Sequence, residues 1–171
     1  MKRIHIIGIS GSGKSYLADK ISKKLNIEKI DLDDIYWENK FSKKRELSCA
    51  KKLLNKKLEQ KDNWITEGIY TNWISYAIEN SDKIIWIQID NNLKLSWRIF
   101  SRWWKRRGEN IESILSMIDL LKFQWNYKRI RTGKEKSLYS AHRKMVEKYK
   151  EKLIILKSEK EVNNFIKNLK K

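Results

Sequence analysis

Residues 8–15 have the types and spacing of a loop that binds phosphate. Their sequence, GISGSGKS, matches the pattern G-x-x-x-x-G-K-[ST], with a strand-like run before it and a helical run after it. Glycines let main-chain N–H groups approach phosphate oxygens, and the following helix adds its dipole. Lys14 would reach the β- and γ-phosphates and the Ser15 hydroxyl would bind Mg²⁺, so we expect a magnesium-loaded triphosphate here rather than an ordinary glycine turn. The expected nucleotide contacts are Gly8, Ser10, Gly11, Ser12, Gly13, Lys14, Ser15 and Tyr16.

A magnesium–nucleotide site needs a carboxylate beside the loop, and two predicted strands end in one. Glu67 ends the run NWITEG, and Asp90 ends the more hydrophobic run KIIWIQID. Asp90 is followed by Asn-Asn-Leu, which is typical of a helix N-cap. Glu67 is followed by Gly68, and a glycine lets a ligand come close. We favour Glu67 as the carboxylate on the magnesium side and keep Asp90 as the alternative.

Three aspartates, Asp31, Asp33 and Asp34, follow the second predicted strand. In open α/β sheets the ligand lies beyond the carboxyl ends of the strands, which would put this cluster near the γ-phosphate. Asp33 would orient or deprotonate an acceptor hydroxyl, and Asp31 would share the water shell of the metal. The alternative is a helix N-cap followed by packing of the Ile-Tyr-Trp segment.

An arginine stripe is expected on the helix predicted over residues 92–107. Arg98, Arg102 and Arg106 recur every four residues with no acid between residues 98 and 107. Mobile arginines can neutralise the charge of a phosphoryl group in transfer and help to exclude water, so Arg98 and Arg102 are candidate catalytic residues. The alternative is a solvated basic face. Arg107, Arg129 and Arg131 would join the stripe from later segments.

Most large apolar residues are expected to pack in the core. The opposite, buried stripe of the arginine helix is expected to comprise Leu93, Trp97, Phe100 and Trp104, and core positions are expected for Trp86, Trp97 and Trp125. Trp37 and Trp73 would wall an acceptor pocket, with packing as the alternative. No catalytic or metal-binding role is expected of His5, His142 or Cys49.

These residues must be positioned by alternating strands and helices. Strands are predicted at 3–9, 28–31, 63–68, 83–90 and 152–156, and helices at 14–25, 43–60, 71–79, 92–107, 110–128, 134–149 and 159–169. The alternation predicts an α/β fold with a five-stranded parallel sheet and helices on both faces. We expect a single domain, residues 1–171, with a core at 1–92 and 150–171 and a helical insertion at 93–149.

Composition limits the partners. The 171 residues carry 39 Lys plus Arg against 21 Asp plus Glu, a net charge of +18, which favours nucleotides, nucleic acid or acidic lipid. A single cysteine rules out an intrachain disulfide framework. No apolar run reaches the roughly 18 residues needed to span a bilayer, and the first residues lead directly into a strand. A cytoplasmic protein without a membrane partner, monomeric or homodimeric, is therefore expected.

The chain resembles the adenylate-kinase-related P-loop proteins labelled DNA topology modulation proteins, nearly end to end. The similar segments are RIHIIGISGSGKS, DLDDIYW, NWITEGIY, KIIWIQID, LSWRIFSRWWKRRG, KFQWNYKRIR and KLIILKSEKEVNNF. The resemblance implies a three-layer α/β/α P-loop kinase fold with an ATP-binding core and an arginine-bearing lid. It supports Glu67 and Asp33 as site residues. The chain departs from the family at Ile9, where a small residue is expected, and in a shortened lid without the usual proline and cysteine.

Three functions remain open from the sequence. The favoured one is a nucleoside-monophosphate-kinase-like phosphotransferase that moves the γ-phosphate of ATP to a nucleotide, nucleoside or other hydroxyl metabolite. The second is a nucleic-acid-binding protein affecting DNA topology with a regulatory ATP site, suggested by the net charge and by Trp103 and Trp104 among the arginines. The third is an ATPase or switch protein without an acceptor.

Overall fold

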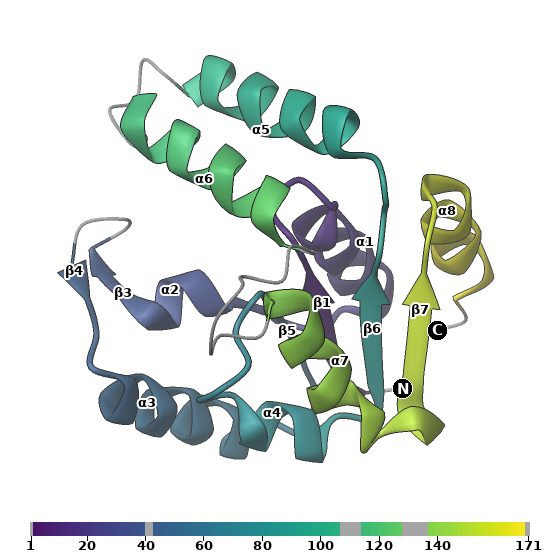
Figure 1. Ribbon diagram of the computed structural model, residues 1–171. Helices are drawn as coiled ribbons and strands as arrows, with labels where there is room; N and C mark the ends of the chain where they lie inside the picture. Colours follow the sequence, from purple (N-terminus) through teal and green to yellow (C-terminus); the bar gives the residue numbers. More distant parts are fainter. Residues whose placement is uncertain (1, 40–42, 107–113, 128–136, 170–171) are drawn as a thin grey trace.

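The centre of the protein is a five-stranded parallel sheet with strand order β2-β5-β1-β6-β7 (Figure 1). The computed structural model describes residues 2–39, 43–106, 114–127 and 137–169. All four neighbouring strand pairs are parallel. The predicted α/β class and five-stranded sheet are therefore confirmed. The strands are β1 Arg3–Gly8, β2 Lys29–Asp31, β5 Trp64–Gly68, β6 Lys83–Ile87 and β7 Leu153–Leu156.

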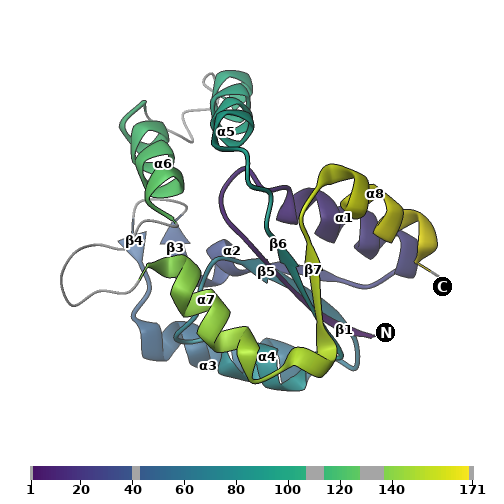
Figure 2. The same cartoon turned by 45° about the vertical axis from the view of Figure 1, so that its right-hand side comes forward.

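Helices cover both faces of the sheet and give three layers (Figure 2). Alternate strand residues point to opposite faces, so each face has its own core. Ile4 and Ile6 of β1 pack on the side of α1 and α8, whereas Ile7 packs on the side of α2, α3, α4 and α7. The bounds are α1 Lys14–Leu25, α2 Leu32–Tyr36, α3 Leu47–Glu59, α4 Ser75–Asn80, α7 Leu138–Glu147 and α8 Glu159–Asn168, and a short 3₁₀ helix, η1, spans Lys150–Lys152.

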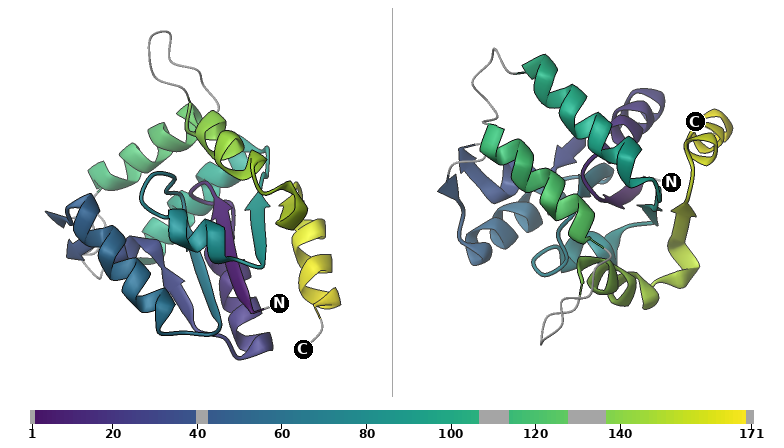
Figure 3. Two further views of the ribbon diagram at one scale, coloured as in Figure 1. Left: turned by 90° about the horizontal axis from the view of Figure 1, so that it is seen from below. Right: turned by 45° about the horizontal axis from the view of Figure 1, so that its top comes forward.

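Two further helices, α5 Asn92–Arg106 and α6 Ile114–Asn126, form a hairpin above the carboxyl ends of the strands (Figures 1 and 3). Ser96 and Gln124 join them by a hydrogen bond of 2.9 Å. A small antiparallel pair, β3 Trp37–Asn39 with β4 Lys43–Lys44, was not predicted. It occupies residues expected to form the acidic turn and the start of the helix at 43–60.

The predicted buried stripe of α5 is wrong. Leu95 and Ile99 are the residues that face the core, at 2% and 1% exposed, and Leu95 packs with Ile9 and Tyr127. The helix has two apolar stripes, and the sequence alone does not say which one meets the sheet. The large apolar residues of the outward stripe are Leu93, Trp97, Phe100 and Trp104.

Other core assignments had mixed outcomes. Trp86 is buried as predicted, whereas Trp125 is exposed along with Trp97. The sequence pattern of the helix at 43–60 predicts that Leu47, Leu54 and Leu58 face inward. On α3, Leu54 and Leu58 do so, but Leu47, at the first turn of the helix, is exposed. Within the described ranges, no helix is long and apolar enough to cross a membrane.

Candidate active site

The loop between β1 and α1 has the backbone conformation of a tight cradle. Gly11 and Gly13 have φ angles of 80° and 94°, in the left-handed region that side-chain-bearing residues rarely adopt. Ser12 N donates to Ile9 O at 3.0 Å, which closes the turn. A Cβ on Gly11 would lie 2.8 Å from the main-chain oxygen of Leu95, so the loop also touches α5 directly. The first N–H groups of α1 are thereby presented at the open end of the loop.

A cavity of about 480 Å³ opens beside this loop. Its volume lies in the range of ligand-binding pockets. It brings together the predicted Lys14, Arg98 and Arg102, which come from two distant segments. Arg102 Nε is buried and has no hydrogen-bond partner among the described residues, so this donor is available to a ligand. The lining residues are Gly11, Ser12, Gly13, Lys14, Ser15, Tyr16, Ile89, Arg98, Arg102, Glu159, Val162 and Asn163.

Glu159, a residue that sequence reasoning missed, holds Arg98 at the rim of the cavity. Its carboxylate accepts from Arg98 and from Lys94, the latter at 2.7 Å, and Arg98 also donates to Gly11 O at 3.2 Å. The hydrogen bond from Lys94 and the nearby charge of Arg98 lower the pKa of Glu159. Arg98 of the arginine stripe is therefore paired with an acid from α8, although no acid interrupts the stripe in sequence. The side chain of Arg106 and residues Arg107, Arg129 and Arg131 lie outside what the structure describes.

Glu67 and Asp31 lie side by side at the ends of β5 and β2. They are register partners, and both follow the alternation that places Ile65 against α1. Glu67 is 1% exposed and neither of its carboxylate oxygens has a partner in the described chain. Burial, followed by the charge of Glu67, raises the pKa of Asp31 to about 6. Two adjacent carboxylates are thus held in a poorly solvated place, and both interact with the nearby charge of Lys29.

This pair fits a divalent ion of the magnesium type. Mg²⁺ is commonly held by one or two carboxylates together with water and substrate phosphates. The face that carries Glu67 is covered by α1, whose first turn contains Ser15. Among the described residues, no group of three or more His, Cys, Asp or Glu side chains could hold a metal on its own.

Asp33 lies in the first turn of α2 and is oriented by two contacts. Its main-chain N–H donates to Asp31 Oδ1 at 2.9 Å, which makes Asp31 the N-cap, and its carboxylate accepts from the hydroxyl of Tyr70 at 2.8 Å. Burial and the charge of Asp33 raise the pKa of Tyr70, so the phenol stays a proton donor. Asp33 is thus held in a fixed orientation, and its acceptor-facing role stays a prediction. The N-cap alternative is realised by Asp31.

Aromatic rings surround this turn. Tyr36 stacks on Trp73 with ring centroids 6.2 Å apart and contacts Tyr70 at 4.9 Å. Trp73 is buried in the core on that face, so packing, the alternative offered by the sequence, explains its position. Trp37 is half-buried and meets Tyr36 edge-on at 5.3 Å.

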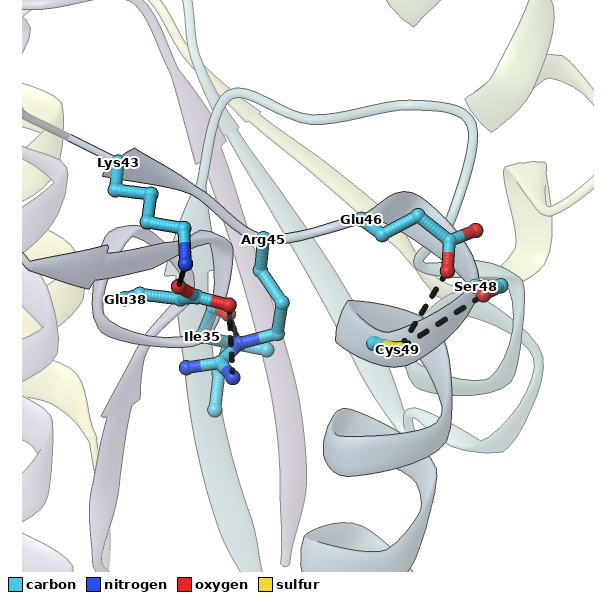
Figure 4. Close-up of polar contacts among 7 residues, drawn as sticks. All are labelled: Ile35, Glu38, Lys43, Arg45, Glu46, Ser48 and Cys49. Carbon is cyan, nitrogen blue, oxygen red and sulfur yellow. Dashed lines mark hydrogen bonds and ion pairs between the residues drawn. The ribbon is translucent and has the colours of Figure 1, made fainter.

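The connection from α2 to α3 is tied by Arg45 (Figure 4). Arg45 Nε donates to Ile35 O at 3.0 Å, and Glu38 bridges Lys43 at 2.7 Å and Arg45 at 4.0 Å. These contacts fix the helix that carries Asp33 from its far end. Cys49 is exposed on α3, where its thiol lies 3.5 Å from Glu46.

His142 anchors the loop that follows Glu67 and Gly68. Burial lowers its pKa to about 4, so the ring is neutral at ordinary pH. Ile69 O can only accept, at 2.8 Å from Nε2; hence Nε2 carries the proton and Nδ1 accepts from Tyr127 at 2.8 Å. The sequence indicated no catalytic or metal-binding role for His142, and in the structure the ring holds the loop at Ile69 in place. A Cβ on Gly68 would meet Leu32 at 2.8 Å, so this glycine makes room for packing.

Asp90 does not cap α5. Asn91 Oδ1 accepts from Lys94 N at 2.9 Å, so Asn91 is the N-cap. Asp90 is exposed beyond the end of β6.

Comparison with known proteins identifies the family to which the chain belongs. Residues 44–130, just over half of it, match the model of the phosphoribulokinase/uridine kinase family. The chain belongs to this family. Membership of the phosphoribulokinase/uridine kinase family, together with the P-loop kinase fold, supports the activity of a phosphotransferase that uses a nucleotide.

Solved kinases share the fold of this family member at low identity. Shikimate kinase from Bacteroides thetaiotaomicron gives a TM-score of 0.56 at 17% identity, covering 97% of this chain and 94% of that one. A gluconokinase from Sinorhizobium meliloti 1021 gives 0.56 at 12% identity, with 97% and 87% covered. Deoxyadenosine kinase from M. mycoides with bound dATP gives 0.55 at 19% identity, with 97% of each chain covered. At these identities the likeness concerns the fold alone.

A closer relative in sequence is the uncharacterized protein YqaC of Bacillus subtilis (strain 168). It is 36% identical over 110 residues, which are 64% of this chain and 61% of YqaC. The match therefore spans less than two thirds of that relative.

Proposed function

We propose that this protein transfers the γ-phosphate of ATP to a hydroxyl group of a small acceptor, such as a nucleotide, a nucleoside or a related metabolite. The observation that carries the proposal is the cavity in which Lys14 of the glycine-rich loop, Arg98 and Arg102 converge. A cradle of main-chain N–H groups with three cations suits a polyphosphate, and positioning with charge neutralisation is most of what phosphoryl transfer requires. The adenine preference and the nucleoside-monophosphate-kinase-like type follow from the family resemblance.

Each residue has a role in this proposal. Lys14 contacts the β- and γ-phosphates, and Arg98 and Arg102 neutralise the phosphoryl oxygens. Ser15 and Glu67, with Asp31 nearby, would hold Mg²⁺, which when bound offsets the charge of the phosphates. Asp33, oriented by Tyr70, accepts the proton of the acceptor hydroxyl.

We further propose that the α5–α6 hairpin acts as the lid. It supplies Arg98 and Arg102 to the cavity and stands above the strand ends, whereas α7 packs on the core through Val146. Within the insertion at residues 93–149, this proposal assigns the lid to the first two helices and leaves α7 to the core.

An acceptor screen tests the function. Purified protein with ATP and Mg²⁺ would be offered uridine, deoxyadenosine, nucleoside monophosphates, shikimate, gluconate and ribulose 5-phosphate, with product detected by mass spectrometry. Transfer to one acceptor class, abolished by Lys14→Ala and reduced on the order of a hundredfold by Arg98→Ala or Arg102→Ala, supports the proposal. Unchanged ATP affinity and turnover in Lys14→Ala would refute the site.

Two alternatives compete. A nucleic-acid-binding protein affecting DNA topology, the label of the resembling family, has the net charge of +18 as its support. It predicts salt-sensitive DNA binding without acceptor turnover. An ATPase or switch protein predicts phosphate release that no acceptor changes.

A further inference from the structure

The outer face of the α5–α6 hairpin is apolar and exposes large side chains to solvent. We define the hairpin face by its seven large side chains, Leu93, Trp97, Phe100, Trp104, Ile114, Ile118 and Trp125. They are 75%, 66%, 37%, 51%, 59%, 36% and 53% exposed, in that order. The right panel of Figure 3 shows α5 and α6 side by side with no other described element drawn over them.

On α5 the face is a single stripe that points away from the core. Residues 93, 97, 100 and 104 recur at helical spacing, on the side opposite Leu95 and Ile99. Phe100 lies 5.9 Å from Trp97 and 6.1 Å from Trp104 between ring centroids, so the aromatic rings form a row.

The stripe continues onto α6. Trp125 Nε1 donates to Ser96 Oγ at 3.0 Å, which fixes the end of α6 beside the start of α5. Ile114, Ile118 and Trp125 share one side of α6 at helical spacing. The hydrogen bond of Trp125 with Ser96 therefore places the apolar side of α6 next to the row on α5.

The exposed area is large for a protein surface. If a tryptophan presents about 250 Å², the three indoles alone leave roughly 400 Å² in water. That area already reaches the size of the largest apolar patch on a typical monomer, and such patches mark sites of interaction.

The charge beside the face is positive. Helix α5 contains five cationic residues, Lys94, Arg98, Arg102, Lys105 and Arg106, and no acidic residue, although Glu159 of α8 pairs with Lys94 and Arg98. One hollow on the helix is lined by Trp97 together with Arg98, Ser101, Arg102 and Lys105, and the next by Trp97, Phe100, Ser101 and Trp104. Indole rings thus lie directly beside cations.

We propose that the hairpin face binds the surface of a bilayer that contains anionic lipid. A helix with Trp, Phe and Leu on one face and Lys and Arg on another lies in the plane of such an interface. Tryptophan rings favour the headgroup level, and cations near the surface are attracted to anionic headgroups. Lying on a bilayer requires no spanning helix.

Other occupants fit less well. Two copies of a chain with a net charge of +18 repel each other. A nucleic acid strand would stack on the indoles but would leave Leu93, Ile114 and Ile118 in water, whereas acyl chains cover them. The inference is independent of the proposed kinase function.

Vesicle sedimentation tests the proposal. The full chain would be mixed with vesicles of equimolar phosphatidylcholine and phosphatidylglycerol, or of phosphatidylcholine alone. We expect binding to the anionic vesicles, at least about tenfold weaker for Trp97→Ser/Trp104→Ser. Lys105→Glu should weaken binding less. Leu47→Ser, an exposed leucine on α3, is the matched control and should bind like the native chain. Circular dichroism of each variant confirms that it is folded.

Four results would overturn it. The first is no sedimentation with anionic vesicles. The second is equal sedimentation of the native chain and the folded double tryptophan variant, because net charge alone would then explain binding. The third is a vesicle-free dimer that the double variant abolishes, since a second copy would then cover the face. The fourth is single-stranded DNA binding that the double variant abolishes while anionic vesicles bind neither protein.

Discussion

The hydroxyl of Tyr70 donates a hydrogen bond to Asp33 Oδ1 across 2.8 Å. Tyr70 lies in the loop after β5 and Asp33 in the first turn of α2, which follows β2, so the bond joins two segments at the carboxyl edge of the sheet. If Asp33 accepts the acceptor's proton, Tyr70→Phe should lower kcat by about ten- to a hundredfold, because the carboxylate loses its fixed orientation. The KM for ATP should stay unchanged, since the nucleotide cavity is lined by other residues. Steady-state kinetics measures both; an altered KM for ATP with native kcat would contradict the role.

Glu67→Gln should stabilise the protein without ligand but reduce the stability that it gains from ATP and Mg²⁺. The buried carboxylate has no hydrogen-bond partner in the described chain, so a neutral isostere should raise the free energy of unfolding without ligand by about 1–3 kcal/mol. With ATP and Mg²⁺ present, the native chain should gain more stability than the variant, because only the native carboxylate attracts the ion. Urea unfolding with and without ATP and Mg²⁺ checks both halves. A variant that is less stable without ligand would show that Glu67 is already satisfied.

Glu159→Gln should release Arg98. A polyphosphate entering the cavity competes with Glu159 for this guanidinium, and an exposed ion pair is worth up to about 1 kcal/mol. ATP should therefore bind about two- to fivefold more tightly at low salt, with the difference lost at high salt. Isothermal titration calorimetry measures it, with Glu28→Gln, which breaks a distant surface pair with Lys61, as the control. Weaker ATP binding would instead mean that Glu159 contacts the nucleotide.

Acid should destabilise the fold through two buried histidines. Burial lowers the pKa of His5 to about 3 and of His142 to about 4, so the unfolded chain takes up protons first as the pH falls. The stability that the neutral rings contribute is complete above pH 6.5, and each loses about 1.4 kcal/mol per pH unit on the way down to its folded pKa. Asp31 acts with the opposite sign below about pH 6, because its folded pKa is raised.

His5→Gln isolates this effect. Urea unfolding at pH 7 and pH 5 should show a smaller loss of unfolding free energy in the variant than in the native chain. Equal losses in the two proteins would mean that the His5 ring does not resist protonation.

The strands and the phosphate loop were predictable because their signals are local. Residues 8–15 match a defined sequence motif, and β6 is apolar on both faces. Neither signal requires knowledge of the rest of the fold. That Asp31 and Glu67 share one edge also follows, since parallel strands bring their carboxyl ends together, whereas their side-by-side placement depends on the pairing of β2 with β5, which the sequence does not indicate.

The features that the sequence did not predict depend on contacts between distant segments. Trp97 and Leu95 lie on two apolar stripes of one helix, and only the contact of Leu95 with Ile9 decides which is inside. Glu159 has the ordinary sequence context of an acid in the first turn of a helix, and nothing in that pattern indicates its pairing with Arg98. Tyr70 likewise gives no local signal of its bond to Asp33.

Gly11 also has a consequence for how this protein can change over generations. The phosphate-loop consensus allows any residue at this position, yet an alanine would need a left-handed backbone and would meet Leu95 O at 2.8 Å. A substitution that the consensus accepts would therefore push α5 off the loop and carry Arg98 with it. Among descendants of this sequence, we expect position 11 and the first turns of α5 to vary together, as a single inherited unit.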